Sequence, residues 1–248
     1  MRLLVTRPEL EATRTAERLR ALGHEPVIAP MLQTVFLDPP LPAIDPAAIL
    51  LTSLNGLRAL ARWPLPAAWF ALPVLAVGDR TAAAARGAGF ADVRSADGDG
   101  VALAELTLAT LPPTAGTLLY PAAVDRAGNW TETLAQAGYE LALVEAYRMD
   151  PAASLPDSAA TSLREGRIDG VLLYSPRTAT ALVRCLAALD PPARLDGLTI
   201  YALSENVAAA LRAGNLRFGT IRIAEKPTDD ALLALLPGSV GTSPSGVR

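Results

Sequence analysis

The chain is poor in the side chains that bind metal ions and form disulfides. Its 248 residues contain one cysteine, Cys185, and one histidine, His24. A disulfide within the chain is therefore excluded, and a zinc site of Cys and His ligands cannot be assembled. A Ser–His–Asp triad would have to use His24, which lies in a helix-to-strand link and is expected to be a surface turn residue. Cys185 lies within a helical pattern and is expected in the core.

Nucleotide-binding signatures are also missing. Residues 74–90, VLAVGDRTAAAARGAGF, read as a strand, a tight turn and a helix, which is how nucleotide-binding folds hold phosphate. However, neither G-x-G-x-x-G nor G-x-x-x-x-G-K-[ST] occurs there, and the only lysine of the chain is Lys226. The net charge of −3 gives no basic footprint for a nucleic acid.

Long apolar runs are absent as well. The N-terminal run Leu3–Val5 is far too short for a signal peptide or a membrane span, so we expect a cytoplasmic protein that does not bind membranes. Aromatic residues make up only 5% of a chain that is 51% hydrophobic, which favours aliphatic cores between helices and a sheet. Residues 237–248 are rich in Gly, Ser and Pro and are expected to be disordered.

Short apolar strands alternate with helical patterns along the whole chain. This alternation is typical of βαβ units, and it predicts an α/β fold with parallel sheets covered by helices on both faces. Five of the strands are each followed by a polar turn and a helix. These five are Ile49–Thr52, Val74–Val77, Thr117–Tyr120, Val171–Tyr174 and Leu198–Leu203.

The βαβ units resemble one another across the chain. Three pairs of segments match, namely Leu50–Leu60 with Leu172–Leu182, Val77–Ala84 with Leu203–Ala210, and Arg2–Val27 with Thr117–Ala142. The offsets of 122, 126 and 115 residues are similar, which indicates two copies of one lobe. The first unit has its twin late in the other lobe, so we expect one lobe to be inserted in the other. Residues 1–36 plus 152–236 then form lobe 1 and residues 40–146 form lobe 2, with two linker strands and a cleft between the lobes.

Polar turns follow the predicted strands, at the edge where open parallel sheets bind ligands. Each turn offers hydroxyls or amides beside a helix N-terminus, which favours anions. Three turns also carry arginine, which grips carboxylates. The candidate binding residues are Thr6, Arg7, Ser53, Asn55, Gly78, Arg80, Ser175, Arg177, Ser204 and Asn206. The alternative for each turn is helix capping alone. Tyr147, at the second crossing between lobes, either packs the linker or reaches the cleft as a hydrogen-bond donor or acid.

The chain contains the motifs VTRP (5–8), LLTSLNG (50–56), VGDRTA (77–82), LVEAYR (143–148), LLYSPRTA (172–179) and ALSENVAAAL (202–211). In the order and spacing of these motifs it resembles the uroporphyrinogen-III synthase family over residues 1–236. The resemblance implies two lobes joined by a two-stranded linker and a monomer without metal or cofactor. It also implies the substrate hydroxymethylbilane, a linear tetrapyrrole with many carboxylates, which is dehydrated and cyclised with inversion of ring D.

The resemblance assigns roles residue by residue. Tyr147 matches the linker tyrosine that assists departure of the hydroxyl, and Thr81 matches the threonine of the G-x-x-T-A turn. Ser53, Ser175 and Ser204 match turns that hold carboxylates. The twin of Thr81 is Val207, so one lobe lacks this hydroxyl.

Three questions stay open at this stage. The chain could be a non-catalytic tetrapyrrole or anion-binding module, because loss of catalysis need not mark the turns. A two-lobed sugar or amino-acid receptor fits less well, since aromatic residues are scarce. The preceding enzyme of the pathway, a deaminase, is a possible partner.

Overall fold

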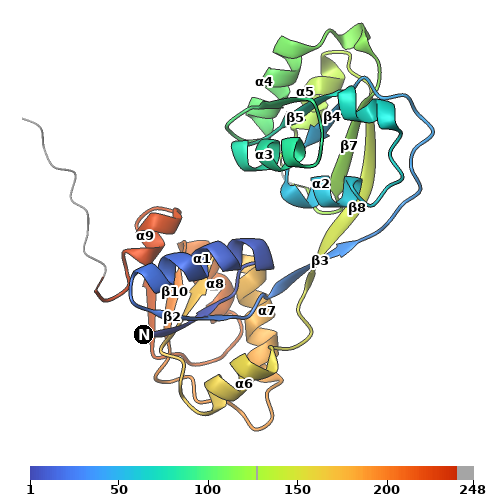
Figure 1. Ribbon diagram of the computed structural model, residues 1–248. Helices are drawn as coiled ribbons and strands as arrows, with labels where there is room; N and C mark the ends of the chain where they lie inside the picture. Colours follow the sequence, from blue (N-terminus) through green and yellow to red (C-terminus); the bar gives the residue numbers. More distant parts are fainter. Residues whose placement is uncertain (127, 239–248) are drawn as a thin grey trace, which may run out of the picture. The chain divides into compact units, whose positions relative to one another are not determined.

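The computed structural model describes residues 1–126 and 128–238, which divide into two compact units. Unit 1 contains Met1–Gln33 together with the chain from Asp150 onward, and unit 2 is the continuous segment Thr34–Met149. The chain therefore passes between the units twice (Figure 1). Residues 239–248 of the tail that the sequence predicts to be disordered lie outside the described residues.

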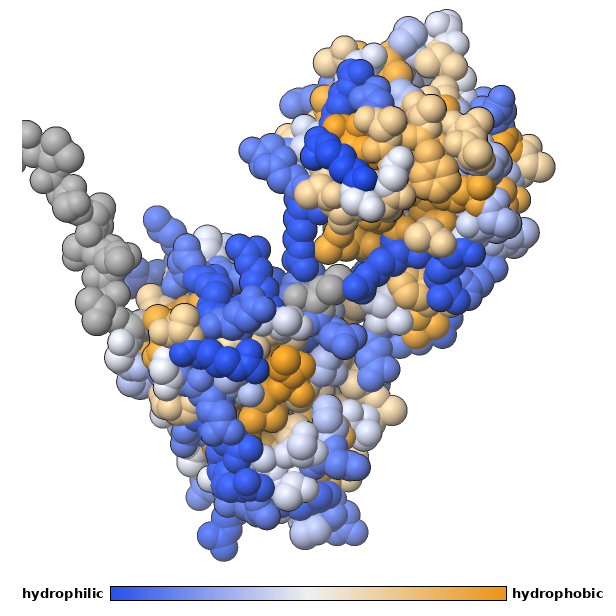
Figure 2. Space-filling view, in the orientation of Figure 1, coloured by the Kyte–Doolittle hydropathy of each residue, from blue (hydrophilic) through white to orange (hydrophobic). Residues whose placement is uncertain are grey.

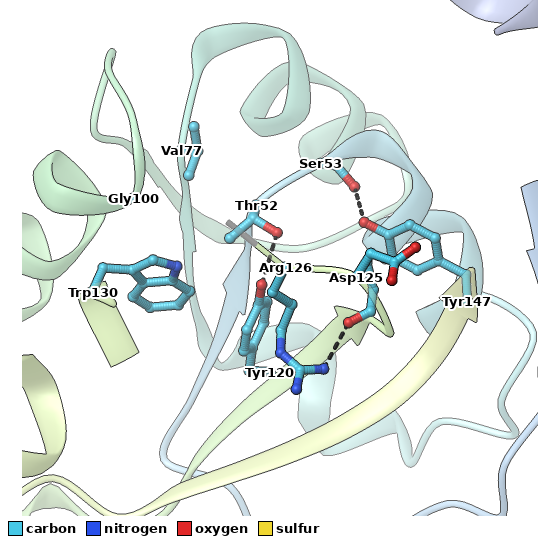
Figure 3. A pocket seen from close by; sticks show the side chains of 10 residues that line it. Thr52, Ser53, Val77, Gly100, Tyr120, Asp125, Arg126, Trp130 and Tyr147 are labelled. Atoms are coloured by element: carbon cyan, nitrogen blue, oxygen red, sulfur yellow. Dashed lines mark hydrogen bonds between the residues drawn. The ribbon is translucent and has the colours of Figure 1, made fainter. Parts of the chain in front are cut away.

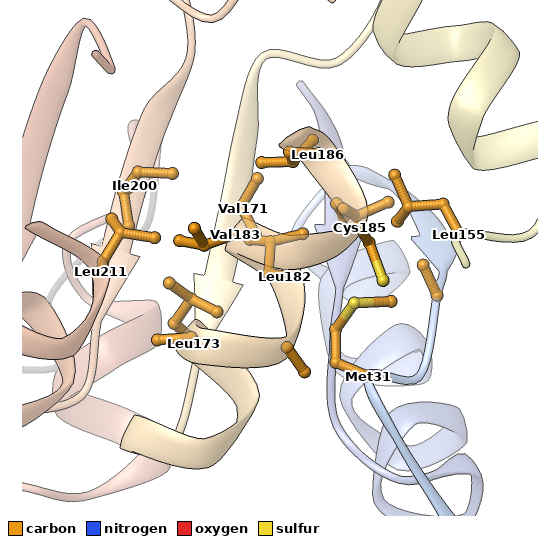
Figure 4. Close-up of a cluster of buried hydrophobic side chains, with 14 of the residues drawn as sticks. Met31, Leu155, Val171, Leu173, Leu182, Val183, Cys185, Leu186, Ile200 and Leu211 are labelled. Carbon is orange, nitrogen blue, oxygen red and sulfur yellow. The ribbon is translucent and has the colours of Figure 1, made fainter. Parts of the chain in front are cut away.

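Unit 1 is built on a five-stranded parallel sheet, which we call sheet A. Its strand order is β11 (Thr220–Ile223), β10 (Thr199–Ala202), β9 (Gly170–Leu173), β1 (Arg2–Val5) and β2 (Glu25–Ile28). Its helices are α1 (Glu9–Ala21), α6 (Asp157–Arg164), α7 (Pro176–Ala187), α8 (Glu205–Arg212) and α9 (Asp229–Leu233). Successive side chains of a strand point to opposite faces, so Leu3 packs with α1 and α9 while Leu4 packs with α6, α7 and α8. Figure 4 shows the second of these cores, which contains Cys185 as expected.

Unit 2 contains a six-stranded sheet, sheet B, with helices on both faces. The strand order is β3 (Leu32–Phe36), β8 (Leu141–Pro151), β7 (Leu118–Ala123), β4 (Ala48–Leu51), β5 (Pro73–Ala76) and β6 (Asp92–Ser95). The helices are α2 (Leu54–Leu60), α3 (Asp79–Gly87), α4 (Gly100–Thr110) and α5 (Trp130–Gln136), with 3-10 turns at Ala67–Ala71 and Pro113–Ala115. Ile49 of β4 packs with α2 and α3 and its neighbour Leu50 packs with α4 and α5, so the sheet is buried on both faces.

The two units share one strand plan, with a shifted starting point in the chain. Sheet A runs β2-β1-β9-β10-β11, and sheet B runs β8-β7-β4-β5-β6 beyond β3. Thus β1 and β2 correspond to β7 and β8, as the offset of Arg2–Val27 from Thr117–Ala142 predicts. The prediction of two similar parallel-sheet α/β lobes is confirmed.

One expectation about exposure was wrong. His24 is buried, with 8% of its surface exposed, and its Nδ1 lies 3.4 Å from the N-terminal nitrogen of Met1. The amide of Glu25 donates to the carbonyl of Met1 at 2.8 Å. This pairing of β2 with β1 carries the preceding residue, His24, against the chain's first residue.

Among the described residues, no helix combines the length and the apolar composition needed to cross a membrane.

Candidate active site

Sheet A places Thr6 and Arg7 at its carboxyl edge, but both side chains serve the fold. Thr6 is fully buried, and its Oγ1 donates to the carbonyl of Leu172 at 2.6 Å. Arg7 donates to both carboxylate oxygens of Asp229 at 2.9 and 2.8 Å, and it lies 4.2 Å from the centre of the Tyr174 ring. The expectation of an accessible Thr6 hydroxyl was therefore wrong, and an internal carboxylate competes with any ligand for Arg7.

The other candidate turns of unit 1 are helix N-termini. Ser175 caps α7, since its Oγ accepts from the amide of Thr178 at 3.2 Å. Ser204 precedes α8, and its side chain makes no capping hydrogen bond there. Arg177 and Asn206, in the first turns of these helices, are exposed. These residues stay candidates for substrate binding.

In unit 2, Gly78 and Thr81 begin α3 by main-chain bonds. The amide of Thr81 donates to the carbonyl of Gly78 at 3.0 Å, and no side chain caps this helix. Thr81 is the third residue of the helix and is 7% exposed, and its hydroxyl does not cap the helix. A Cβ built on Gly78 would meet no atom within 4 Å, so the turn is open, and Arg80 beside it is exposed.

Ser53 joins the N-terminus of α2 to Tyr147 of β8. Its Oγ accepts from the amide of Gly56 at 3.2 Å and lies 2.8 Å from the Tyr147 phenol oxygen. The Tyr147 side chain is buried, with 5% of its surface exposed. Asn55, two residues after Ser53, is half-buried with its amide nitrogen 3.9 Å from the Met149 sulfur. The structure thus brings Ser53 and Tyr147 into contact, and it places Asn55 near Met149 of the same strand.

A second phenol stands beside the first, and the sequence did not point to it. Tyr120 of β7 has its hydroxyl 3.2 Å from Oγ1 of Thr52, the neighbour of Ser53. Its ring packs edge-on against Trp130, with ring centres 5.0 Å apart and an interplanar angle of 63°. Two adjacent hydroxyl residues after β4 therefore hold two phenols, one each from β7 and β8.

These side chains surround a pocket of about 250 Å³ within unit 2 (Figure 3). The lining residues are Thr52, Ser53, Val77, Gly100, Tyr120, Ala123, Asp125, Arg126, Trp130 and Tyr147. The pocket lies past the carboxyl ends of β4 and β7, where connections leave toward opposite faces of sheet B. This point of reversal is where open α/β sheets bind ligands.

Burial sets the protonation of both phenols. Burial raises the pKa of Tyr147 above its usual value, and the hydrogen bond from Ser53 offsets part of the shift. Burial likewise raises the pKa of Tyr120, against the opposing effects of Thr52 and the Arg126 charge. Both hydroxyls therefore keep their protons through neutral pH and can donate hydrogen bonds.

Part of the surroundings is apolar. Val101 and Val124, which adjoin the lining residues Gly100 and Ala123, are 59% and 37% exposed. Figure 2 shows hydrophobic residues among the hydrophilic ones on the visible surface of each unit. A pocket of mixed polar and apolar lining next to apolar surface suits an organic ring that carries polar groups.

Comparison with known proteins identifies the family. A family model described as uroporphyrinogen-III synthase HemD matches residues 13–234. The chain belongs to the uroporphyrinogen-III synthase family. No curated protein sequence gives a significant match.

Solved synthase structures resemble the chain as well. The uroporphyrinogen-III synthetase of Helicobacter pylori shares 18% identity with a TM-score of 0.60, and the match covers 95% of this chain and 98% of that one. A mutant uroporphyrinogen III synthase of the extremely thermophilic bacterium Thermus thermophilus shares 20% identity with a TM-score of 0.47, over 95% and 97% of the two chains. The first of these matches supports the family's two-lobed α/β fold.

Among residues 1–126 and 128–238, no three His, Cys, Asp or Glu side chains cluster in a way that could hold a metal ion.

Sequence reasoning missed Thr52, Tyr120, Asp125, Arg126 and Trp130. Their only signal is a tyrosine in the otherwise aliphatic run TLLYPAA, at a position where the twin segment has Val5. The pocket depends on β7 lying beside β4, which brings Tyr120 to Thr52 although they are 68 residues apart in the chain. No pattern in the local sequence predicts that β7 pairs with β4.

Proposed function

We propose that the protein is a uroporphyrinogen-III synthase, a hydro-lyase of haem biosynthesis. It would dehydrate and cyclise hydroxymethylbilane, with inversion of ring D, to give uroporphyrinogen III. Membership of the family over residues 13–234 supports this reaction. The observation that carries the proposal is the buried Tyr147 phenol, held by Ser53 at 2.8 Å inside the pocket of unit 2.

The hydrogen bond between Ser53 and Tyr147 can run in either direction, because a serine hydroxyl has one proton and two lone pairs. Ser53 Oγ already accepts from the amide of Gly56, and its own proton remains to be donated. If Ser53 donates to the phenol oxygen of Tyr147, the phenol proton is left to point at a ligand. Tyr147 then acts as the donor to the hydroxyl that leaves the substrate.

The reaction needs little else from the protein. The C–O bond of the hydroxymethyl group breaks, the electron pair leaves with oxygen, and a proton supplied through Tyr147 completes the water. The lone pair of the pyrrole nitrogen supplies the electrons, and the ring closure that follows releases a proton that restores the phenol. General acid assistance of this kind contributes about 10²–10⁴-fold in rate.

Positioning supplies the specificity. The linear substrate closes without an enzyme to the wrong isomer, so the protein must favour attack at the substituted carbon of ring D. The turn at Gly78, which is open and lies at the N-terminus of α3, is suited to a substrate carboxylate. We keep Asn55, Arg80, Ser175, Arg177, Ser204 and Asn206 as further candidates for carboxylate binding.

The test couples the protein to a bilane-forming deaminase and separates the product isomers. We expect type III isomer with the protein present and type I alone when it is omitted. Type I alone in both reactions would refute the enzymatic proposal. If the protein then bound the type III product, it would be a non-catalytic tetrapyrrole-binding module.

A further inference from the structure

The carboxyl edge of sheet A carries an arginine that holds a carboxylate of the chain itself. Nη1 of Arg7 donates to both carboxylate oxygens of Asp229, at 2.9 and 2.8 Å. Arg7 lies two residues after the end of β1, and Asp229 is the first residue of α9, 222 residues further along the chain. Charge-assisted hydrogen bonds from arginine are also the contacts by which proteins bind the carboxylates of ligands. Asp229 therefore offers Arg7 the same chemical group as a ligand carboxylate.

The pair lies where a ligand is expected in this fold. β1 and β9 are neighbouring strands, and β1 leads to α1 on one face of sheet A while β9 leads to α7 on the other. Open α/β sheets bind ligands at the carboxyl ends of two such strands. Unit 2 has its pocket at the corresponding place, past the ends of β7 and β4. In unit 1 this place is occupied by Arg7 and Asp229.

Arg7 has a second contact, which does not depend on Asp229. Its guanidinium carbon lies 4.2 Å from the centre of the Tyr174 ring, and Tyr174 directly follows β9. The face of an aromatic ring attracts a guanidinium group and orients its plane. The Arg7 side chain is 22% exposed, so a ligand can reach it. Arg7 therefore keeps its place at the sheet edge when its carboxylate partner is exchanged.

Asp229 can leave Arg7 without moving its helix. Its side chain is 39% exposed, and an ion pair with that exposure contributes little to stability. The Nη1 of Arg18 lies 3.7 Å from the Asp229 carboxylate and offers it another cationic partner. The helix α9 is held separately, because its residues Leu232 and Leu233 pack in the core that contains Leu3. A rotation of the Asp229 side chain is therefore enough to free the Arg7 guanidinium.

We propose that Arg7 is a binding site for a substrate carboxylate, and that Asp229 occupies this site until the substrate arrives. On binding, a carboxylate of the substrate accepts the hydrogen bonds of Arg7 Nη1 in place of the Asp229 oxygens. The Tyr174 ring keeps its contact with the guanidinium, and no covalent bond forms or breaks. The identity of the ligand rests on the proposed function, whose substrate is a tetrapyrrole with many carboxylates.

The test is whether the two members of the pair affect affinity in opposite directions. The measurement is the Kd of uroporphyrinogen III, from equilibrium titration of each variant. Arg7→Gln removes the cation and should raise Kd by about 10–100-fold, the effect typical of hydrogen bonds to a charged group. Asp229→Asn removes the competing charge and should lower Kd by about 2–5-fold, which corresponds to the loss of an exposed ion pair. Arg7→Lys, which keeps a positive charge, should recover part of the affinity.

The ion pair of Arg2 and Glu25 is the matched control. Its atoms lie 3.1 Å apart at the opposite end of β1, at the amino edge of sheet A. Arg2→Gln and Glu25→Gln should leave the Kd of uroporphyrinogen III as in the wild type. A pair of Arg7 and Asp229 that only ties α9 to the sheet would instead lower Tm in both of its variants and leave their Kd values unchanged.

Two outcomes separate this site from the proposed function. If Asp229→Asn leaves Kd unchanged or raises it while the wild type makes type III isomer, the carboxylate site is refuted and the proposed function stands. If the wild type makes no type III isomer but the Kd values shift in opposite directions, the carboxylate site stands and the proposed function is refuted.

Discussion

At the scale of single residues, the pocket is a set of paired hydroxyls. Ser53 and Thr52 are adjacent in sequence, and each contacts one buried phenol, Tyr147 or Tyr120. Ser53 also caps α2, so one side chain starts the helix and orients the candidate acid. Ser53 therefore caps the helix and also contacts Tyr147, and its role in substrate binding stays a prediction.

Replacing Tyr147 by Phe should slow turnover and spare the fold. The ring stays in the core and only its hydroxyl is lost, so kcat should fall about 10²-fold with little change in KM. The free energy of unfolding should drop by about 1 kcal/mol, the net value of one hydrogen bond. Steady-state kinetics and urea unfolding measure the two effects.

Tyr139→Phe is the control for this change. Tyr139 is also buried, but it donates to the carbonyl of Leu111 and does not line the pocket. The control should lose stability without losing kcat. A Tyr147→Phe variant with wild-type kcat would remove the acid role.

His24 should make unit 1 less stable in mild acid. Burial, and then the charge of the N-terminus, lower its pKa below the usual 6.5. As the pH drops below about 6.5, His24 is protonated more readily in the unfolded chain than in the folded chain. The free energy of unfolding therefore decreases as the pH falls. Urea unfolding at pH 7.5 and 5.5 should show a larger loss for the wild type than for His24→Gln. Equal losses would show that His24 does not contribute.

At the scale of secondary-structure elements, the close approach of α2 to β7 builds the pocket. Gly56 of α2 faces the carbonyl of Pro121, and a Cβ added there would lie 2.9 Å from that oxygen. Such a contact cannot form without moving the helix or the strand. The absence of a side chain at Gly56 thus sets the spacing between Ser53 and Tyr120.

Gly56→Ala should destabilise the protein by about 1–3 kcal/mol through this clash. Gly87, at the end of α3, meets no atom within 4 Å, so Gly87→Ala should stabilise by up to about 1 kcal/mol through helix propensity. Thermal unfolding should therefore show a lower Tm for Gly56→Ala and an unchanged or higher Tm for Gly87→Ala. A stable Gly56→Ala variant would contradict the spacing argument.

The sequence predicts the elements well and the contacts of the turns poorly. Apolar runs such as Ile49–Thr52 and Val74–Val77 predicted strands because both faces of a parallel strand are buried, and β4 and β5 lie there. The turn residues were predicted as a class, but the partner of Arg7 is Asp229, 222 residues away. Similarly, Thr6 bonds across to Leu172. Such contacts come from strand order, which local patterns do not encode.

At the scale of the whole molecule, the two copies of the lobe differ at the carboxyl edge of their sheets. In unit 1, the place beside β1 and β9 is occupied by Arg7, Tyr174 and Asp229 in mutual contact. In unit 2, the corresponding place beside β7 and β4 holds the pocket with its two phenols. Tyr174 takes the position of Thr52 in the matching segments, so a bulky residue stands where unit 2 has a small hydroxyl.

The continuous unit should fold by itself. Residues 34–149 include apolar cores on both faces of sheet B, built from their own side chains. Expressed alone, this segment should show helical and strand signals by circular dichroism and one cooperative thermal transition. A fragment that melts without cooperativity would show that unit 2 depends on unit 1.

The most direct test of the central claim is a crystal structure of the protein with uroporphyrinogen III bound. The claim is that the pocket of unit 2 receives the ring at which the chemistry occurs. We expect one pyrrole ring of the product in that pocket, within hydrogen-bond reach of Tyr147. A product that is bound while this pocket stays empty would contradict the claim.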